Sequence, residues 1–385
     1  MRRGIIHRIL LMCGVLLTAA GCLDGSYSGP FDPTTLAVDP IAVVIRFADK
    51  EESKATYEGK GTLQDLTKLE NDTMYVSIVR NDQKVSFRNS ANFLLQNRPA
   101  VVNLQDSKLD WMLKDGDAPV YYPWHERAKE GYAMFAWYAD NAEKGATKVL
   151  EDRICRHLRI DGTQDVMGSK AYAWSTSSPN EKLYSFSYYT AVRNLEPLVC
   201  PTHLLTCMSF RFKAHISEVK QRITIKSVTI KACNNIILTA CSSGDQWQTI
   251  ETEGEPVDLG YHLIPGYEQR EGKSLTINSV SSKAEMPLPV YVGDILFPPT
   301  TATSTLIAIN AEQEVFNASL NGYGEPVPFH TELEINHPSG LKAGYNYVAT
   351  LTVNGTDFIG ARVSVVDWGE GGSIIVDEDY EPGFN

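Results

Sequence analysis

The sequence has few cysteines and no recognisable catalytic signature. Seven cysteines occur in 385 residues, and none has the C-x-x-C spacing of a zinc or redox site. The chain also lacks a G-x-S-x-G elbow, an H-E-x-x-H motif, a Walker A loop and a G-x-G-x-x-G turn that opens a helix. No metal, cofactor or catalytic residue is therefore expected, and the sequence favours a non-enzymatic protein.

A basic surface is missing as well. Lysine and arginine together number 35 against 47 aspartates and glutamates, and the formal net charge is −12. Nucleic acid is a polyanion and is bound through clusters of basic side chains, which this sequence does not show. No nucleic-acid partner is expected.

Long helical patterns are absent too. No segment keeps an apolar period of about 3.6 residues over several turns, and no repeat of roughly 20–50 residues occurs. The chain instead shows short apolar or alternating stretches separated by turn residues about every ten positions, a pattern typical of an all-β sandwich or barrel. The predicted strands are 41–47, 74–79, 84–87, 119–124, 132–138, 155–160, 170–175, 183–190, 203–216, 223–232, 236–240, 261–264, 288–297, 305–309 and 329–336.

The clearest pattern lies near the end of the chain. Apolar residues occupy alternate positions from Tyr345 to Val353, and the pattern resumes in Ile359–Val366 before Trp368. Between them, Asn354-Gly355 supplies residues that tolerate the positive φ of a tight turn. Because a strand with one buried face needs a period of two, this stretch predicts a closing β-hairpin.

The N-terminus carries a targeting segment. A basic region, Arg2–Arg8, precedes the apolar run Ile9–Ala20, which is too short to cross a bilayer as a helix. Small residues then lead into Cys22, which resembles the bacterial lipoprotein box, where the new N-terminal cysteine is lipidated. We interpret residues 1–21 as a lipoprotein signal peptide and 22–40 as a flexible tether. An ordinary signal peptide with a chance cysteine is the alternative.

The remainder of the chain divides at a break flanked by prolines, Leu195–Pro201. This break predicts an N-terminal β-sandwich domain over 41–196 and a C-terminal one over 197–370, which suits the length of the chain. Residues 371–385 form an acidic tail.

Five cysteines belong to the predicted domains. Their odd number and wide spacing do not make a disulfide framework. Cys200 with Cys207 and Cys233 with Cys241 are conceivable pairs, but buried free thiols, Cys155 included, are the favoured interpretation.

Aromatic residues support a second interpretation of the function. If Tyr121, Tyr122, Trp124, Trp137 and Tyr138 were exposed, they would form a platform on which sugar rings stack, although such residues are more often core. A carbohydrate-binding surface lipoprotein is therefore an alternative. A surface hydrolase is a third interpretation, because only the fold can bring paired carboxylates together.

In combination, these features resemble the fimbrillin-like lipoproteins of Bacteroidales, which are pilus subunits. The resemblance covers nearly the whole chain, and the closing hairpin is its most diagnostic part. It implies two tandem transthyretin-like β-sandwich domains after a lipoprotein signal peptide. It rests on the Cys22 lipoprotein box, Lys54-Ala55-Thr56, Asp165-Val166-Met167, Pro201–Leu205 and the hairpin region Gly340–Trp368.

The resemblance also implies a mode of assembly. Precursors of this family are lipidated, exported to the outer membrane and cut after the first strand by an arginine- or lysine-specific protease, and a strand of another subunit then fills the groove. Here Arg46 or Lys54 is the candidate cleavage point. A permanent first strand is the alternative. The candidate displaced strand contains Ile41, Val43, Ile45 and Phe47.

We therefore expect a lipid-anchored fimbrial subunit of the outer membrane and cell surface that contributes to adhesion. Its expected partners are other fimbrial subunits, outer-membrane lipid through Cys22, and a host or bacterial surface ligand. The seventeen residues after Trp368 make a poor donor strand, because the apolar run Ser373–Val376 is short and its surroundings are acidic. A tip, minor or anchor subunit fits at least as well as a stalk subunit.

Overall fold

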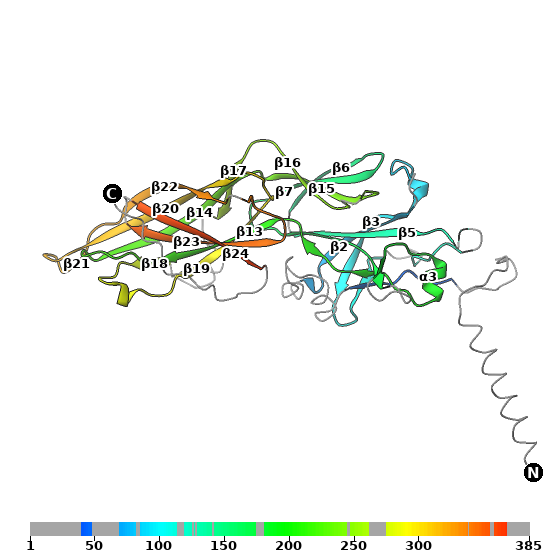
Figure 1. The fold of residues 1–385 in the computed structure, drawn as a ribbon, viewed down its shortest axis with the longest axis horizontal. Helices are drawn as coiled ribbons and strands as arrows, with labels where there is room; N and C mark the ends of the chain where they lie inside the picture. Colours follow the sequence, from blue (N-terminus) through cyan, green and yellow to red (C-terminus); the bar gives the residue numbers. More distant parts are fainter. Residues whose placement is uncertain are drawn as a thin grey trace, which may run out of the picture.

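The computed structural model describes residues 40–47, 69–81, 85–113, 119–124, 127, 129–140, 142–174, 181–244, 247–261, 275–337, 339–354 and 358–367. Cys22, Lys54 and the acidic tail, each the subject of a prediction, lie outside these residues. The described residues are mostly β-strands, with a short helix α3 (Tyr188–Val192). The predicted all-β fold is confirmed, and Figure 1 shows two groups of sheets lying end to end in an elongated molecule.

The first group, here called the N-terminal module, contains strands β1–β12, β15, β16 and helix α3. Its larger sheet has the order β11-β1-β4-β3-β2-β5-β8-β12, and a second sheet has the order β16-β15-β7-β6. The bounds are β1 (Ile45–Phe47), β2 (Thr73–Arg80), β3 (Phe93–Asn103), β4 (Lys108–Trp111), β5 (Tyr132–Ala139), β6 (Glu143–Val149), β7 (Arg153–Arg159), β8 (Val166–Lys170), β11 (Leu198–Val199), β12 (Thr202–His203), β15 (Asn235–Ser242) and β16 (Ile250–Glu253). A separate small hairpin pairs β9 (Ala173–Trp174) with β10 (Lys182–Leu183).

Strand β5 is the centre of this module. All eight of its residues are buried, as the aromatic density of 132–138 predicts. Alternate side chains face two different cores: Met134 and Ala136 pack with the side chains of β1, whereas Phe135 and Trp137 pack toward β7 and β15. A strand covered on both faces reads as a continuous apolar run, which explains its composition.

The second group, the C-terminal module, contains β13, β14 and β17–β24. One of its sheets has the order β19-β13-β23-β24. The other has the order β17-β14-β20; in this sheet β18 also pairs with β14, and both β21 and β22 pair with β20. The bounds are β13 (Thr206–Lys213), β14 (Gln221–Ala232), β17 (Val257–Tyr261), β18 (Leu275–Asn278), β19 (Val290–Phe297), β20 (Ser304–Asn317), β21 (Gly322–Tyr323), β22 (Val327–Asn336), β23 (Tyr345–Asn354) and β24 (Phe358–Asp367). A single buried cluster fills the space between these sheets.

The predicted closing hairpin is present as β23 and β24, which pair in antiparallel fashion over their whole length. Tyr347, Ala349 and Leu351 lie on the predicted apolar face and join the buried cluster. The turn itself lies outside the described residues. The hairpin is held to the module by a parallel pairing of β23 with β13, which the local pattern did not indicate.

Strand pairing crosses the boundary placed between residues 196 and 197. Strands β15 and β16 follow that boundary in sequence, yet β15 pairs with β7 in the N-terminal module. Burial of apolar side chains explains the pairing of β15 with β7, because Ile236, Leu238 and Ala240 complete a cluster whose other members include Leu158 and Trp137.

Three predicted strands are wrong. Residues 119–124 form no strand and contain only an isolated bridge between Ala42 and Tyr121. Residues 85–87 form no strand, and β2 pairs instead with β3, which prediction missed because Pro99 and polar residues interrupt its alternation. The segment 183–190 contains only the end of β10 before α3 begins. There Ser187 and Thr190 form a reciprocal capping box, with the Ser187 amide donating to Thr190 Oγ1 at 2.8 Å, and such caps favour a helix start.

The five cysteines of the modules are free thiols. Four are buried and Cys233 is half-buried, so the favoured interpretation is confirmed for these residues. Burial raises the pKa of Cys241 to about 12, which keeps this thiol protonated and unreactive at neutral pH.

Acid is expected to destabilise the C-terminal module through His337. This side chain is buried beside Thr305, with 2.6 Å between Nε2 and Oγ1, and burial lowers its pKa below the usual value. The unfolded chain then binds the proton more readily, so stability is lost as the pH falls through about 6.5 toward the lower folded value. Denaturant unfolding at pH 7 and pH 5 measures the loss. His337→Gln should reduce the difference in unfolding free energy between the two pH values, whereas His330→Gln, at an exposed position, should leave it unchanged. An equal difference in both variants would contradict the assignment.

Candidate functional site

The candidate displaced strand occupies a slot inside the larger sheet of the N-terminal module. Strand β1 lies between β4, to which it is antiparallel, and β11, to which it is parallel. The Arg46 amide donates to Pro197 O and the Phe47 amide to Ser107 O, both at 2.8 Å. Upstream, the Val43 amide donates to Val120 O at 2.7 Å. The segment is therefore hydrogen-bonded on both sides although β1 is only three residues long.

Side chains of this segment alternate between core and solvent. Val43, Ile45 and Phe47 are buried, with exposed fractions of 2%, 0% and 0%, whereas Val44 is 42% exposed. The sequence predicts a strand that is apolar on both faces except at Arg46, and this is wrong, because only one face meets the core. Burying three such side chains contributes on the order of 5–9 kcal/mol.

Two aromatic side chains form part of the slot. The Trp111 indole Nε1 donates a hydrogen bond of 3.0 Å to the carbonyl oxygen of Val43. Tyr122 packs in the same cluster as Val43 and Ile45, and its amide donates to Ile41 O at 3.0 Å. Burial, assisted by the carboxylate of Glu196, raises the pKa of the Tyr122 hydroxyl, so the slot wall is uncharged at this position.

Charge is confined to the solvent side of the strand. The Arg46 guanidinium is 41% exposed and lies 3.9 Å from the Glu196 carboxylate, a separation at which a surface ion pair contributes little. Arg46 therefore sits within the paired strand, whereas Lys54, the other candidate cleavage point, lies outside the described residues. Ile41 is half-buried against the same cluster as Phe47.

Removal of β1 and the residues just before it would leave an open groove in the larger sheet. Strands β4 and β11 would each lose a hydrogen-bonding neighbour, and the apolar floor that includes Met74, Leu109 and Val199 would lose its cover. Unpaired edges beside an apolar trough are a template for another strand. The geometry can therefore accept an extended peptide with apolar residues at alternate positions.

The proposed sugar-stacking platform does not assemble. Tyr122, Trp137 and Tyr138 are buried, and only Tyr121 and Trp124 remain about one-third exposed. Sequence analysis missed a different aromatic group on the small β9–β10 hairpin. There Trp174 and Tyr184 are each 40% exposed.

This aromatic group is tightly arranged. The ring centroids of Tyr172 and Trp174 lie 5.6 Å apart, and the Lys182 ammonium lies 4.1 Å from the Tyr172 centroid and 5.2 Å from that of Trp174. The spacing of Tyr172 and Trp174 is a sequence signal for this contact, because residues two apart in an extended chain share one face. Lys182 reaches these rings only through the pairing of β9 with β10.

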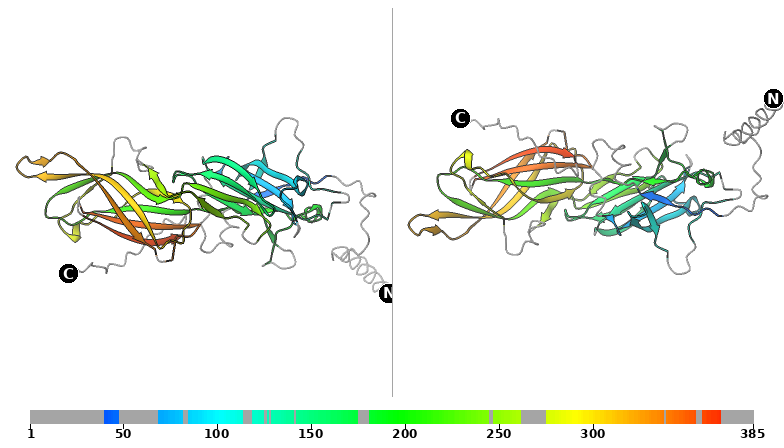
Figure 2. Two further views of the ribbon diagram at one scale, coloured as in Figure 1. Left: turned by 90° about the horizontal axis from the view of Figure 1, so that it is seen from above. Right: turned by 90° about the horizontal axis from the view of Figure 1, so that it is seen from below.

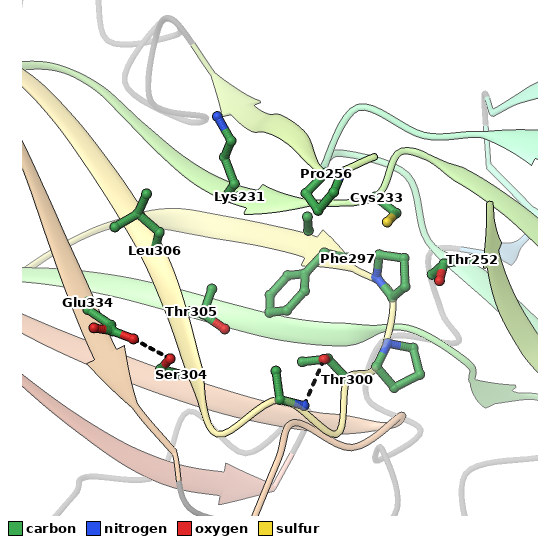
Figure 3. A pocket seen from close by; sticks show the side chains of 14 residues that line it. Lys231, Cys233, Thr252, Pro256, Phe297, Thr300, Ser304, Thr305, Leu306 and Glu334 are labelled. Atoms are coloured by element: carbon green, nitrogen blue, oxygen red, sulfur yellow. Dashed lines mark hydrogen bonds between the residues drawn. The ribbon is translucent and has the colours of Figure 1, made fainter. Parts of the chain in front are cut away.

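A cavity of about 580 Å³ lies where the C-terminal module approaches β16 (Figure 3). Its charged groups are engaged by neighbours: Lys231 Nζ lies 3.2 Å from Asp258, and the Glu334 carboxylate accepts a hydrogen bond from Ser304 Oγ. Among the described residues that line the cavity, Glu334 is the one carboxylate, so these residues do not supply the acid pair that a glycosidase needs.

Other sites were sought in the part of the chain that the structure describes. No group of three or more His, Cys, Asp or Glu side chains there is arranged to hold a metal ion. No helix there is long and apolar enough to cross a membrane. His203, at the junction of the modules, is buried with Nδ1 2.6 Å from Asp165 Oδ2.

No family model matches the sequence, and no curated protein matches it. Solved structures do match. A fimbrial protein from Bacteroides vulgatus ATCC 8482 is similar with a TM-score of 0.52 and 10% identity, covering 85% of this chain and 99% of that one. The fimbrial anchor protein Mfa2 from Porphyromonas gingivalis gives a TM-score of 0.33 and 10% identity, covering 86% of this chain and 99% of that one.

The first of these similarities establishes the architecture. At 10% identity it shows the fold, which is that of a fimbrial β-sandwich protein over most of the chain. The resemblance to fimbrillin-like proteins stated from sequence is thus confirmed at the level of the fold.

Proposed function

We propose that this chain is a non-enzymatic subunit of a surface fimbrium whose precursor is anchored by lipid at Cys22, and that it assembles by strand exchange at the β1 slot and contributes to adhesion. The observation that carries the proposal is the placement of β1 between β4 and β11. A first strand at the edge of a sheet would leave one free edge when lost, whereas this one leaves two edges and an apolar trough. Fimbrial architecture supports the same role.

Lys54 is the proposed cleavage point in preference to Arg46. The Arg46 amide is bonded to Pro197 O, and the next amide is bonded to Ser107 O. A protease must bind its substrate as an extended, unpaired chain, so cleavage at Arg46 requires local opening of the sheet. Cleavage there would also leave Phe47 in the slot.

The acidic tail argues for a particular position in the fibre. A strand that fills the slot needs apolar side chains at alternate positions, as in Val43, Ile45 and Phe47. The run Ser373–Val376 offers only Ile374 and Val376 in that register before Glu378. We therefore place the subunit at a tip, minor or anchor position, where it accepts a strand without donating one from its tail.

The N-terminal residue of the mature surface protein tests this proposal. Edman or mass-spectrometric analysis is expected to find Ala55 in the assembled protein, and Lys54→Gln is expected to block its incorporation while Arg46→Gln does not. The same strains are imaged for fimbriae and assayed for adhesion. A mature protein that begins at Cys22 in intact fibres would refute strand exchange. Fibres and adhesion that are unchanged by loss of this chain would refute the fimbrial role.

Carbohydrate binding remains a second candidate function, on different residues from those first considered. The exposed rings of Trp174 and Tyr184 favour it, because aromatic side chains at a surface can present flat apolar faces to a sugar. A glycan array with the monomer and with the Trp174→Ala variant tests carbohydrate binding. Selective binding that the variant loses supports this function, and no binding by the parent protein rules it out.

A further inference from the structure

The segment that links the two modules most directly is a single two-stranded ribbon. In the C-terminal module, β14 and β17 pair with Ala232 opposite Val257. In the N-terminal module, β15 and β16 pair with Asn235 opposite Glu253. Only residues 233–234 and 254–256 lie between the two pairs, so one antiparallel ribbon runs from one module into the other. Figure 1 shows β14 and β17 in one half and β15 and β16 in the other.

The tip of this ribbon is built into the core of the N-terminal module. Strand β15 pairs with β7 from Asn235 to Ser242. Ile236 and Leu238 are 1% and 0% exposed and pack in one cluster with Trp137. Without the ribbon, β7 would have a free edge and the outer face of β5 would lose much of its cover.

A polar contact fixes the same element. Gln248 Nε2 donates hydrogen bonds to Ala136 O at 2.9 Å and to Ala240 O at 3.1 Å. Its carbonyl end lies against Gly168 so closely that a Cβ there would be 2.1 Å from Gln248 Oε1. The Gln248 Nε2 group is thus bonded to both β5 and β15, and this favours one register because a slip would break both hydrogen bonds.

Further contacts join the modules beside the ribbon. The Gly260 amide donates to Asp161 O at 3.1 Å, and the Leu296 amide donates to Gly162 O at 2.8 Å. In the turn just before β23, the Gly344 amide donates to Leu205 O at 2.8 Å. The junction is thus spanned by backbone hydrogen bonds in addition to the covalent chain.

We propose that the β14–β17 ribbon with its tip β15–β16 is a clasp that makes the two modules one cooperative, load-bearing unit. Strands of both modules run roughly along the long axis of the molecule (Figure 2). Hydrogen bonds in an antiparallel pair are perpendicular to the strands, so tension along the axis loads the bonds of β15 with β7 together and does not open them one by one. The load-bearing role rests on the proposed fimbrial function; the cooperative unfolding does not.

Native-state hydrogen exchange on the isolated chain from Leu23 onward tests the cooperativity. Leu238→Ala alters the clasp and Leu351→Ala, also fully buried, alters the C-terminal core. Each is expected to reduce protection by about 30-fold or more, and to the same extent in β5 and in β23. The proposal fails if Leu351→Ala lowers protection in β23 but not in β5, or if Leu238→Ala lowers it in β5 but not in β23, because the modules would then unfold independently. Should Leu238→Ala not fold, the milder Ile236→Val is read in the same way.

Pulling single molecules from their two ends tests the load-bearing role and needs no fimbriae, so its outcome is separate from that of the fimbrial proposal. One rupture that releases roughly 1,100 Å of chain is expected, since residues 40–367 would extend together. Gln248→Ala should lower the rupture force. Gln313→Ala should not, because its partner Gln221 lies at the end of β14 that is remote from the module junction. Two separate ruptures of about half that length, or a force indifferent to Gln248→Ala, would overturn the proposal.

Discussion

A chain that begins at Ala55 is expected to lose on the order of 5–9 kcal/mol of folding free energy relative to one that begins at Leu23, and to recover most of it with a peptide of sequence 41–47. The loss follows from the burial of Val43, Ile45 and Phe47, each of which contributes about 1.5–3 kcal/mol when buried. Denaturant unfolding with and without peptide measures the recovery, and calorimetry measures peptide binding. The effect is large because it approaches the total stability of many domains.

Two peptide variants provide the matched comparison. Ile45→Asp places a carboxylate in the apolar floor of the slot, which is expected to abolish rescue because a buried unpaired charge is costly. Val44→Asp places the same carboxylate on the exposed face and is expected to preserve rescue. Equal rescue by both peptides, or an Ala55 chain as stable as the longer one, would show that the segment is not held in the way the structure describes.

The second large effect is expected at Gly260, where the modules meet. Its φ is +133°, and an added Cβ would lie 2.6 Å from Val228 O and 2.9 Å from Ile295 Cδ1. Gly260→Ala is therefore expected to cost about 3–5 kcal/mol, from backbone strain together with overpacking. Thermal and denaturant unfolding measure the loss.

Gly244 provides the control for this substitution. An added Cβ there meets no atom within 4 Å, and its backbone lies outside the positive-φ region. Gly244→Ala should therefore change stability by no more than about 0.5 kcal/mol. A Gly260→Ala protein as stable as the control would mean that β17 can shift away from Val228 without loss, and that the junction is less tightly held than its hydrogen bonds indicate.

The sequence specifies some features of the β1 segment and leaves others undetermined. The apolar residues of 41–47 mark a strand locally, but they do not indicate which face is buried, because Val44, which is 42% exposed, is as apolar as its buried neighbours. Nothing near β1 indicates that Leu109 lies opposite Ile45 or that Leu198 lies opposite Arg46, because those partners are supplied by segments far along the chain. Trp111, which bonds the Val43 carbonyl, is likewise recognisable only once β4 is placed.

The same contrast separates the correct and incorrect strand predictions. The closing hairpin was predictable because Tyr347, Ala349 and Leu351 alternate without interruption, and burial of one face is enough to select a strand. Strand β3 was missed because its side chains are mostly half-buried and its pairing with β2 is broken by register shifts. Helix α3 depends on a capping box of two residues, a signal weaker than the apolar residues around it.

The sequence by itself determined that this protein is all-β and where its regularly alternating strands lie. These properties depend on periodicity and burial over a few neighbouring residues. Only the tertiary structure decided that β1 lies between two other strands and that β15 and β16 complete the opposite module. Both are choices among apolar surfaces of similar composition, and the free energy that selects one pairing comes from shape, register and hydrogen bonding between segments far apart in the chain.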